Sequence, residues 1–271
     1  MNPEKFAHQI LFGEKLEDKL QSINVFDFAD YDGNLVPEMP GREKKISFSQ
    51  ERIKFPKYQL FHLKEKRGMA LHYFANHELL AIEMMAAFLW KFPTRNENDK
   101  KLKRGIFSTL CDEQRHLNLY ISRMNELGVE FGSYPLNDFF WKQMLKIKRM
   151  EEFLAVMSLT FESANLDFAL FYKKVFSDVE DHKSAAIMQE VFMDEINHVK
   201  LGLHWLNKWK MDKDLFEYYQ SILPQNMTPS RSRGIGYKRE TREEAGFEKS
   251  FLEKLENYRD PEPFLNRNPN V

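Results

Sequence analysis

The chain has 271 residues, a net charge of −1 and one cysteine, Cys111, which allows one sizeable domain with extensions, excludes an intrachain disulfide and favours a reducing, cytoplasmic compartment. Nothing in the near-neutral charge demands a nucleic acid or an anionic membrane as partner. Charges interrupt every apolar run at the start of the chain, and no stretch of about 18 uncharged apolar residues occurs, so we expect neither a signal peptide nor a membrane span.

The spacing of apolar residues and the placement of glycine and proline predict an all-α chain in three parts. These parts are an N-terminal arm (residues 1–66), a helical core (67–223) and a C-terminal extension (224–271). A short amphipathic helix is expected to cover Pro3–Gln21 of the arm, and another helical stretch is expected around Glu243–Tyr258 of the extension. The core is expected to hold four long helices near 67–92, 98–127, 149–176 and 181–209, with a long crossover between the second and the third and a short fifth helix near 212–223.

The pattern Glu-x-x-His occurs in the second and again in the fourth long helix, as Glu113 with His116 and as Glu195 with His198. Residues three apart lie on one face of an α-helix, so each pair can present two ligands to one metal ion. A single copy is common by chance. Two copies in corresponding helices indicate a repeated metal-binding unit.

Each copy has an upstream partner on the preceding helix, Glu78 for Glu113 and Glu162 for Glu195. The spacing is about 34 residues, and because a helix rises about 1.5 Å per residue, the chain can run up one helix, turn and return to the same level. The order Glu, Glu-x-x-His, Glu, Glu-x-x-His therefore predicts a tandem repeat of two helical hairpins. Each hairpin would supply half of a site.

The four glutamates all lie among apolar neighbours at helical spacing; Glu78, for example, has Ala75 and Ile82 on its own face. A carboxylate within an apolar stripe is costly to bury unless it is paired or bound to a metal ion. The alternative is that these are solvated faces of charged helices, since 30% of the residues are charged. Four carboxylates at matched depths favour the metal site.

Glu83 competes with Glu78 for the ligand position on the first long helix. It lies five residues further along, about 140° round the helix, so both cannot easily reach one pair of metal ions. The residues alone leave both glutamates open, and the family resemblance given below favours Glu78 as the ligand, with Glu83 near the site.

Three further residues are candidates for a layer of groups around the ligands. Asp112 and Asp194 each precede a ligand glutamate and are expected either to accept a hydrogen bond from a ligand histidine or to be surface charges. Tyr120 lies one turn beyond His116 and is expected to be an ordinary core aromatic, with a redox-active tyrosine as the alternative.

Taken in order, these motifs resemble the DUF455 family, a bacterial ferritin-like family. The matching blocks are Leu71–Glu83, Asp112-Glu113-x-Arg115-His116, Leu127-Gly128, Tyr134-Pro135, Trp141, Glu162-x-x-x-Leu166-Asp167, and Asp194-Glu195-Ile196-x-His198-Val199 with Gly202 and Trp205. The resemblance implies a ferritin-like four-helix bundle with a dinuclear iron site held by Glu78, Glu113, His116, Glu162, Glu195 and His198. A more distant similarity, through Ala75-Asn76-x-Glu78, is to the tRNA 2-methylthio-isopentenyladenosine hydroxylase family.

Basic residues cluster around Lys100–Arg104, Lys142–Arg149 and Arg231–Arg242. Such clusters are most often solvated surface, and they leave tRNA only as an unsupported alternative partner.

The expected function is that of an O2-dependent oxidoreductase that hydroxylates or oxidises a small molecule or modified nucleoside. Carboxylate-rich mixed oxygen and nitrogen ligation suits two iron ions, with manganese or a mixed Mn/Fe pair as alternatives. The alternative functions are iron handling, as a ferroxidase or peroxide scavenger, and a radical protein similar to the ribonucleotide reductase small subunit. We expect a monomer or homodimer, with an electron donor that the sequence does not name.

Overall fold

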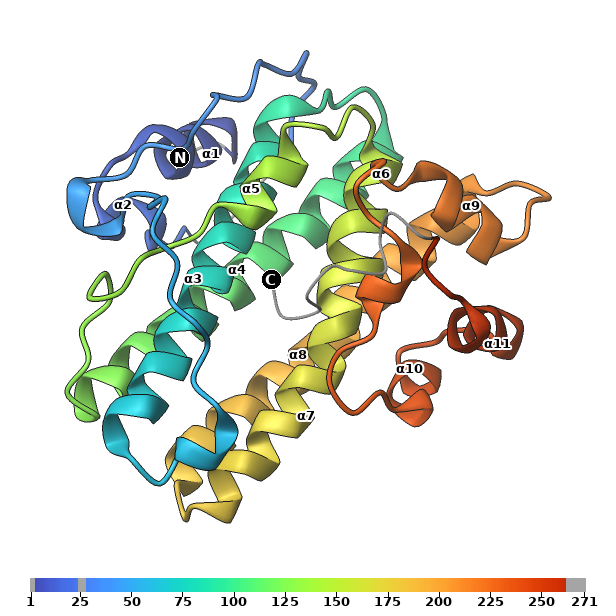
Figure 1. The fold of residues 1–271 in the computed structure, drawn as a ribbon. Helices are drawn as coiled ribbons and strands as arrows, with labels where there is room; N and C mark the ends of the chain where they lie inside the picture. The colour runs from blue at the N-terminus through green and yellow to red at the C-terminus, as the bar shows by residue number, and fades with distance from the viewer. Residues whose placement is uncertain (1–2, 24–27, 262–271) are drawn as a thin grey trace. The chain divides into compact units, whose positions relative to one another are not determined.

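The computed structural model describes residues 3–23 and 28–261 of the chain (Figure 1). These residues form helices and loops, and their β-pairing is limited to two isolated bridges, Tyr31–Thr94 and Phe48–Leu136. The predicted all-α class is therefore confirmed for this part of the chain. The chain divides into two compact units, Met1–Leu145 (unit 1) and Lys146–Val271 (unit 2). These two units do not test the predicted division of the chain into an arm, a core and an extension, which stays a prediction.

Unit 1 is built round one long helical hairpin, α3 against α4. Shorter helices precede and follow the hairpin. The elements of unit 1 are α1 (Pro3–Phe12), α2 (Leu16–Lys19), the 3₁₀ turns η1 (Lys44–Ile46) and η2 (Tyr58–Leu60), α3 (Lys64–Lys91), α4 (Glu97–Glu126) and α5 (Phe139–Met144).

Local sequence signals set the ends of this hairpin. Helix α3 stops before Pro93, because the residue preceding a proline is pushed into the extended region, as Phe92 is. Asn96 caps the start of α4, because its side chain accepts hydrogen bonds from the backbone N–H groups of Asn98 and Asp99. Beyond the last residue of α4, Gly128 has a φ of 81°, the left-handed conformation that favours glycine after a helix.

The N-terminal arm packs on this hairpin, with α1 against α3. The single helix expected within Pro3–Gln21 is wrong in detail, because α1 stops at Phe12 and a separate short α2 follows. A side chain at Gly13 would lie 2.4 Å from Cβ of Asp18. Glycine is therefore required where the chain turns between the two helices.

Unit 2 is built round the second hairpin, α7 against α8. Its elements are α6 (Met150–Val156), the π-helix η3 (Met157–Glu162), α7 (Ser163–Asp178), α8 (His182–Trp209), α9 (Leu215–Ile222), the 3₁₀ turn η4 (Pro229–Ser232), α10 (Arg239–Glu244) and α11 (Lys249–Asn257). The expected third long helix is therefore interrupted by one π-helical segment. Such segments are rare and occur frequently at functional sites.

Two buried contacts stabilise the π-helix. The Thr160 hydroxyl donates to the carbonyl of Ala155 at 2.8 Å and lies 2.7 Å from the hydroxyl of Tyr219 in α9. On the opposite side, Gly202 of α8 comes so close that a Cβ there would lie 2.3 Å from Cβ of Ser158. A glycine in α8 therefore permits the close approach of the helix to the π-segment.

The span Met150–Asp178 is long and apolar enough to cross a membrane by composition alone, but 78% of its apolar window is buried within the protein. A core helix has this pattern, and Glu162 lies within the span.

Candidate metal centre

In unit 1 the structure brings together Glu78 of α3 with Glu113 and His116 of α4. One donor atom from each of the three side chains lies within 4.8 Å of the others, and all three are buried. The apolar stripe of α4 explains the arrangement, because Ile106, Leu110, Leu117 and Met124 are buried on the same face as Glu113. We call these three residues the first Glu/His group.

In unit 2 Glu162, the last residue of η3, lies with Glu195 and His198 of α8. Their donor atoms are again within 4.8 Å of one another and all three side chains are buried. Val191, Val199 and Leu206 are buried on the same stripe of α8. These three residues form the second Glu/His group, with the same composition and helical spacing as the first.

The histidine and glutamate within each Glu-x-x-His motif have the same geometry. Nδ1 of His116 lies 3.5 Å from Oε2 of Glu113, and Nδ1 of His198 lies 3.5 Å from Oε2 of Glu195. Two ligands each about 2.1 Å from one metal ion are separated by about 3.0–3.4 Å, depending on the coordination angle. The observed 3.5 Å is just above this range, so a small side-chain shift would let each pair hold one ion between Nδ1 and a carboxylate oxygen.

Glu83 is buried outside the first Glu/His group. Its carboxylate accepts hydrogen bonds from Arg42 at 3.0 and 2.7 Å, and Nζ of Lys19 lies 3.4 Å away. Burial lowers the pKa of Lys19, while the charge of Glu83 opposes this shift. Two cations from the N-terminal arm thus neutralise Glu83, which serves as an anchor for the arm.

Unit 2 contains a corresponding anchor at Asp167, five residues after Glu162 just as Glu83 is five residues after Glu78. Arg242 of α10 donates to both oxygens of Asp167 at 2.8 Å, and also to the carbonyls of Ser163 and Ser232. Both members of the pair are fully buried. The expectation that Arg242 belongs to a solvated basic cluster is therefore wrong, because it is the cation that ties the C-terminal extension to α7.

Sequence reasoning did not single out Asn165 as a functional residue. Its side-chain amide donates to Oε1 of Glu195 at 2.6 Å, which links the first turn of α7 to the ligand of α8. Its position three residues after Glu162 places Asn165 on the same helix face as Glu162, which is the one sequence feature that indicates a contact with Glu195.

Comparison with known proteins assigns the chain to a family. A family model described as "Protein of unknown function (DUF455)" matches residues 4–253. The chain belongs to the DUF455 family. An uncharacterized protein of Haemophilus influenzae is 22% identical over 216 residues, which cover 75% of this chain and 72% of that protein. No solved structure matches the chain significantly.

The remaining predicted residues of this DUF455 protein lie around the two groups. Asp112 is half-buried and forms an ion pair with Arg115 at 2.8 Å, and Asp194 is half-buried on α8. Tyr120 is buried, with its ring centroid 5.8 Å from that of Phe74 of α3. The two expected roles of Asp112 and Asp194, as acceptors for a ligand histidine or as surface charges, stay predictions.

Two histidines of α3 lie outside the first Glu/His group. The Nε2 of His72 accepts hydrogen bonds from the backbone N–H groups of Gly132 and Tyr134, and burial lowers its pKa to about 4. His77 stacks on Phe140 with ring centroids 5.0 Å apart, and burial lowers its pKa to about 4. Both are therefore neutral near pH 7.

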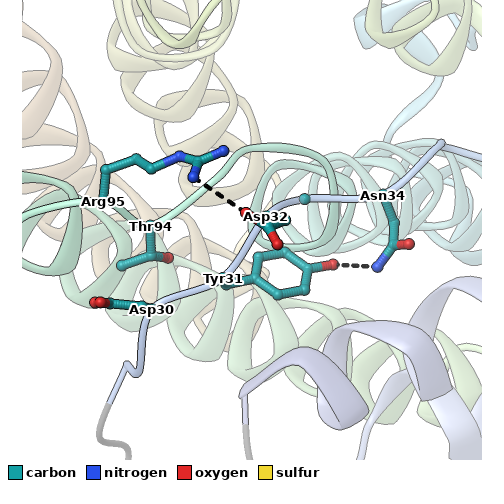
Figure 2. Close-up of a pocket in the computed structure, with 7 residues that line it drawn as sticks. Asp30, Tyr31, Asp32, Asn34, Thr94 and Arg95 are labelled. Atoms are coloured by element: carbon teal, nitrogen blue, oxygen red, sulfur yellow. Dashed lines mark hydrogen bonds and ion pairs between the residues drawn. The ribbon is translucent and has the colours of Figure 1, made fainter.

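A surface pocket in unit 1 contains none of the predicted site residues. It is lined by Asp30–Asn34 of the arm together with Thr94 and Arg95 (Figure 2). In this pocket Arg95 pairs with Asp32 at 3.1 Å, and Asn34 donates to the hydroxyl of Tyr31 at 2.6 Å. Because these polar groups bind one another, the pocket is a joint between the arm and the hairpin.

Some residues of the predicted basic clusters pair with neighbouring acidic side chains. Lys100 pairs with Asp30 and Glu97 in unit 1. Arg149 pairs with Glu151 and Glu152 in unit 2, and Arg239 pairs with Glu243 and Glu256. The alternative of tRNA as a partner stays a prediction.

Proposed function

We propose that the two Glu/His groups together form one dinuclear metal site. The observation that carries the proposal is the repeat itself, because two buried groups of identical chemistry occur at corresponding positions of two helical hairpins. In a ferritin-like bundle, four helices contribute one such set of ligands. We infer that the two hairpins of this chain pair to form that bundle.

The donor set suits a pair of divalent iron ions. Four carboxylates balance the charge of two such ions, and each Glu-x-x-His motif adds one imidazole nitrogen. Carboxylate-rich ligation favours iron or manganese over copper or zinc, which prefer nitrogen- and sulfur-rich sets. Glu78, Glu113 and His116 would hold one ion, and Glu162, Glu195 and His198 would hold the other.

We propose that the site serves an O2-dependent oxidoreductase that hydroxylates or oxidises a small molecule or modified nucleoside. Bound iron would supply the electrons and the open coordination positions that dioxygen requires. The protein would contribute ligands of defined orientation in a core from which apolar side chains exclude water. Fully buried neighbours such as Leu79, Leu110 and Val199 give the ligands these surroundings.

The extensions favour an enzyme over an iron-storage protein. Helix α1 of the arm packs on α3, and Arg242 ties the extension to α7. Surfaces of both hairpins are therefore covered by the protein's own chain. A storage shell needs such surfaces for contacts between many copies, whereas large ordered segments beside the core can enclose a substrate.

The first experiment measures metal content. We expect about two iron ions per chain after anaerobic loading with Fe(II), and His116→Ala and His198→Ala should each remove at least one ion. His204→Ala is the matched control, because His204 is an exposed histidine on the same helix as His198. One ion or none in the wild-type protein would contradict the dinuclear site.

The second experiment separates the oxygenase from a storage protein. Fe(II) is added in large excess under air, and particle size and soluble iron are measured. We expect about two ions per chain in a monomer or dimer. Many ions per chain within a shell-sized particle would overturn the oxygenase proposal in favour of iron storage.

A further inference from the structure

The two Glu/His groups have the same ligands but different neighbours. The clearest difference lies three residues after the first glutamate of each hairpin, on the face directed at the second helix. Unit 2 has Asn165 at this position, and unit 1 has Ala81. A side chain that can hydrogen-bond to a ligand is therefore replaced by a methyl group.

The amide of Asn165 determines how Glu195 is presented. Its hydrogen bond to Oε1 is short, at 2.6 Å, and Oε2 of the same carboxylate lies 3.5 Å from Nδ1 of His198. The two oxygens of Glu195 therefore have different partners. Oε1 is held by the amide, and Oε2 is directed, together with the imidazole, at the position where a metal ion would lie.

We propose that Asn165 is a positioning residue that holds Glu195 as a monodentate ligand, so that the second Glu/His group binds a divalent metal ion more tightly and fills first. The inference rests on the proposed dinuclear site and adds an order of loading to it. The physical reason is preorganisation: a carboxylate whose orientation is already fixed loses less side-chain freedom when it binds a metal ion.

The anchors of the two hairpins do not account for such a difference. Glu83 and Asp167 are both neutralised by buried cations from an extension, at the same distance along the helix from the ligand. The amide of Asn165 has no such counterpart at Ala81. Hydrogen bonds to ligands typically change metal affinity by about 10–100-fold when they are removed.

The experiment is an anaerobic titration of the metal-free protein with Mn(II), in which the free ion is measured by electron paramagnetic resonance. We expect two classes of binding site in the wild-type protein. His198→Ala should abolish the tighter class and His116→Ala the weaker one. Asn165→Ala should weaken the tighter class by about 10–100-fold and bring the two classes close together.

Two further variants separate positioning from a general structural role. Asn165→Leu keeps the approximate shape of the side chain without its hydrogen-bond donor or any charge, so it should weaken the tighter class about as much as the alanine variant. Gln189→Ala is the matched control, because Gln189 of α8 accepts a hydrogen bond of the same length, 2.6 Å, from Lys173 of α7. It should leave both classes unchanged.

The outcomes distinguish the inference from the proposed function. If the wild-type protein binds two ions but the tighter class disappears in His116→Ala, or if both Asn165 variants bind Mn(II) as the wild type does, the positioning role is overturned and the dinuclear site stands. If the wild-type protein does not bind two ions, the proposed dinuclear site itself fails, and the order of loading fails with it.

Discussion

The two hairpins carry the same ligand pattern, yet they differ one helical turn away from it. Four residues before the first glutamate and four after the histidine, unit 1 has Phe74 and Tyr120, whose rings are in contact. At the corresponding positions unit 2 has Ser158 and Gly202, which are in such close contact that a Cβ on the glycine could not be accommodated. In unit 1 an aromatic pair fills the space between α3 and α4. In unit 2 the backbone of α8 lies directly against η3.

The difference extends to the backbone. Glu78 lies in the middle of an uninterrupted α-helix of 28 residues, whereas Glu162 is the last residue of a π-helix. Asn165 further distinguishes unit 2, where it donates to Glu195. A repeated ligand pattern therefore sets which atoms can bind a metal ion, while the surrounding residues set how rigidly each atom is held.

The largest effects are expected from variants that distinguish the anchors, Glu83 and Asp167, from the proposed ligands Glu78 and Glu162. Glu83→Ala and Asp167→Ala each leave buried cations without their carboxylate, so each should lower the free energy of unfolding by about 3–5 kcal/mol. Glu78→Ala and Glu162→Ala should instead lose metal with a smaller effect on the metal-free protein. Urea unfolding with a chelator present and metal analysis of each variant provide the two measurements. Loss of metal from Glu83→Ala with Glu78→Ala unaffected would reverse the assignment on α3.

Removing a cation that pairs with each anchor should lower the free energy of unfolding by different amounts in the two units. Among the residues that the structure describes, Arg242 is the one cation that pairs with Asp167, so Arg242→Met should cost about 3–5 kcal/mol of unfolding free energy. Arg42 shares Glu83 with Lys19, so Arg42→Met leaves one cation in place and should cost only about 1.5–3 kcal/mol. Chemical denaturation of both variants checks the ranking, and equal losses would show that Lys19 does not compensate.

Acid sensitivity should arise in unit 1. Burial lowers the pKa of His72 in the folded protein to about 4, from an ordinary value of 6.5. Between these two pH values His72 is protonated in the unfolded chain and neutral in the folded chain. The contribution of His72 to stability is therefore complete above pH 6.5 and falls by up to about 1.4 kcal/mol per pH unit as the pH approaches 4. The corresponding position in unit 2 is Val156, which does not titrate.

The measurement is urea unfolding at pH 7 and pH 5 for the wild type and for His72→Gln, whose side-chain carbonyl can still accept from the backbone. We expect the wild type to lose about 2 kcal/mol more than the variant between the two pH values. Identical pH dependence in both proteins would show that His72 is not the acid-sensitive group.

The smallest effects concern the contacts one turn from the ligands. Gly202→Ala forces a Cβ against Ser158 and should cost about 1–3 kcal/mol, because neither backbone can move easily in a packed core. Tyr120→Phe keeps the ring against Phe74 and should cost about 1 kcal/mol or less. Thermal unfolding of the two variants compares them. A larger loss for Tyr120→Phe than for Gly202→Ala would indicate that the Tyr120 hydroxyl contributes more to stability than the close contact at Gly202 does.

The amino-acid sequence by itself determined the helical class, most helix boundaries and the repeat of Glu78, Glu113 and His116 by Glu162, Glu195 and His198. These features follow from local rules, because helix periodicity, a proline or glycine stop and the i, i+3 spacing act within a few residues. The second long helix, predicted near 98–127, is observed as Glu97–Glu126, and Gly128 just beyond it has the left-handed φ of 81° that lets a helix end at glycine.

Only the tertiary structure decided which buried charges pair and which side chains support the ligands. The anchors of Glu83 by Arg42 and of Asp167 by Arg242 join residues 41 and 75 positions apart, and no local pattern indicates such partners. The same holds for the π-helix, which depends on the hydroxyl of Tyr219 and on the space opposite Gly202. These features depend on contacts between distant segments, and such contacts exist only when the chain is folded.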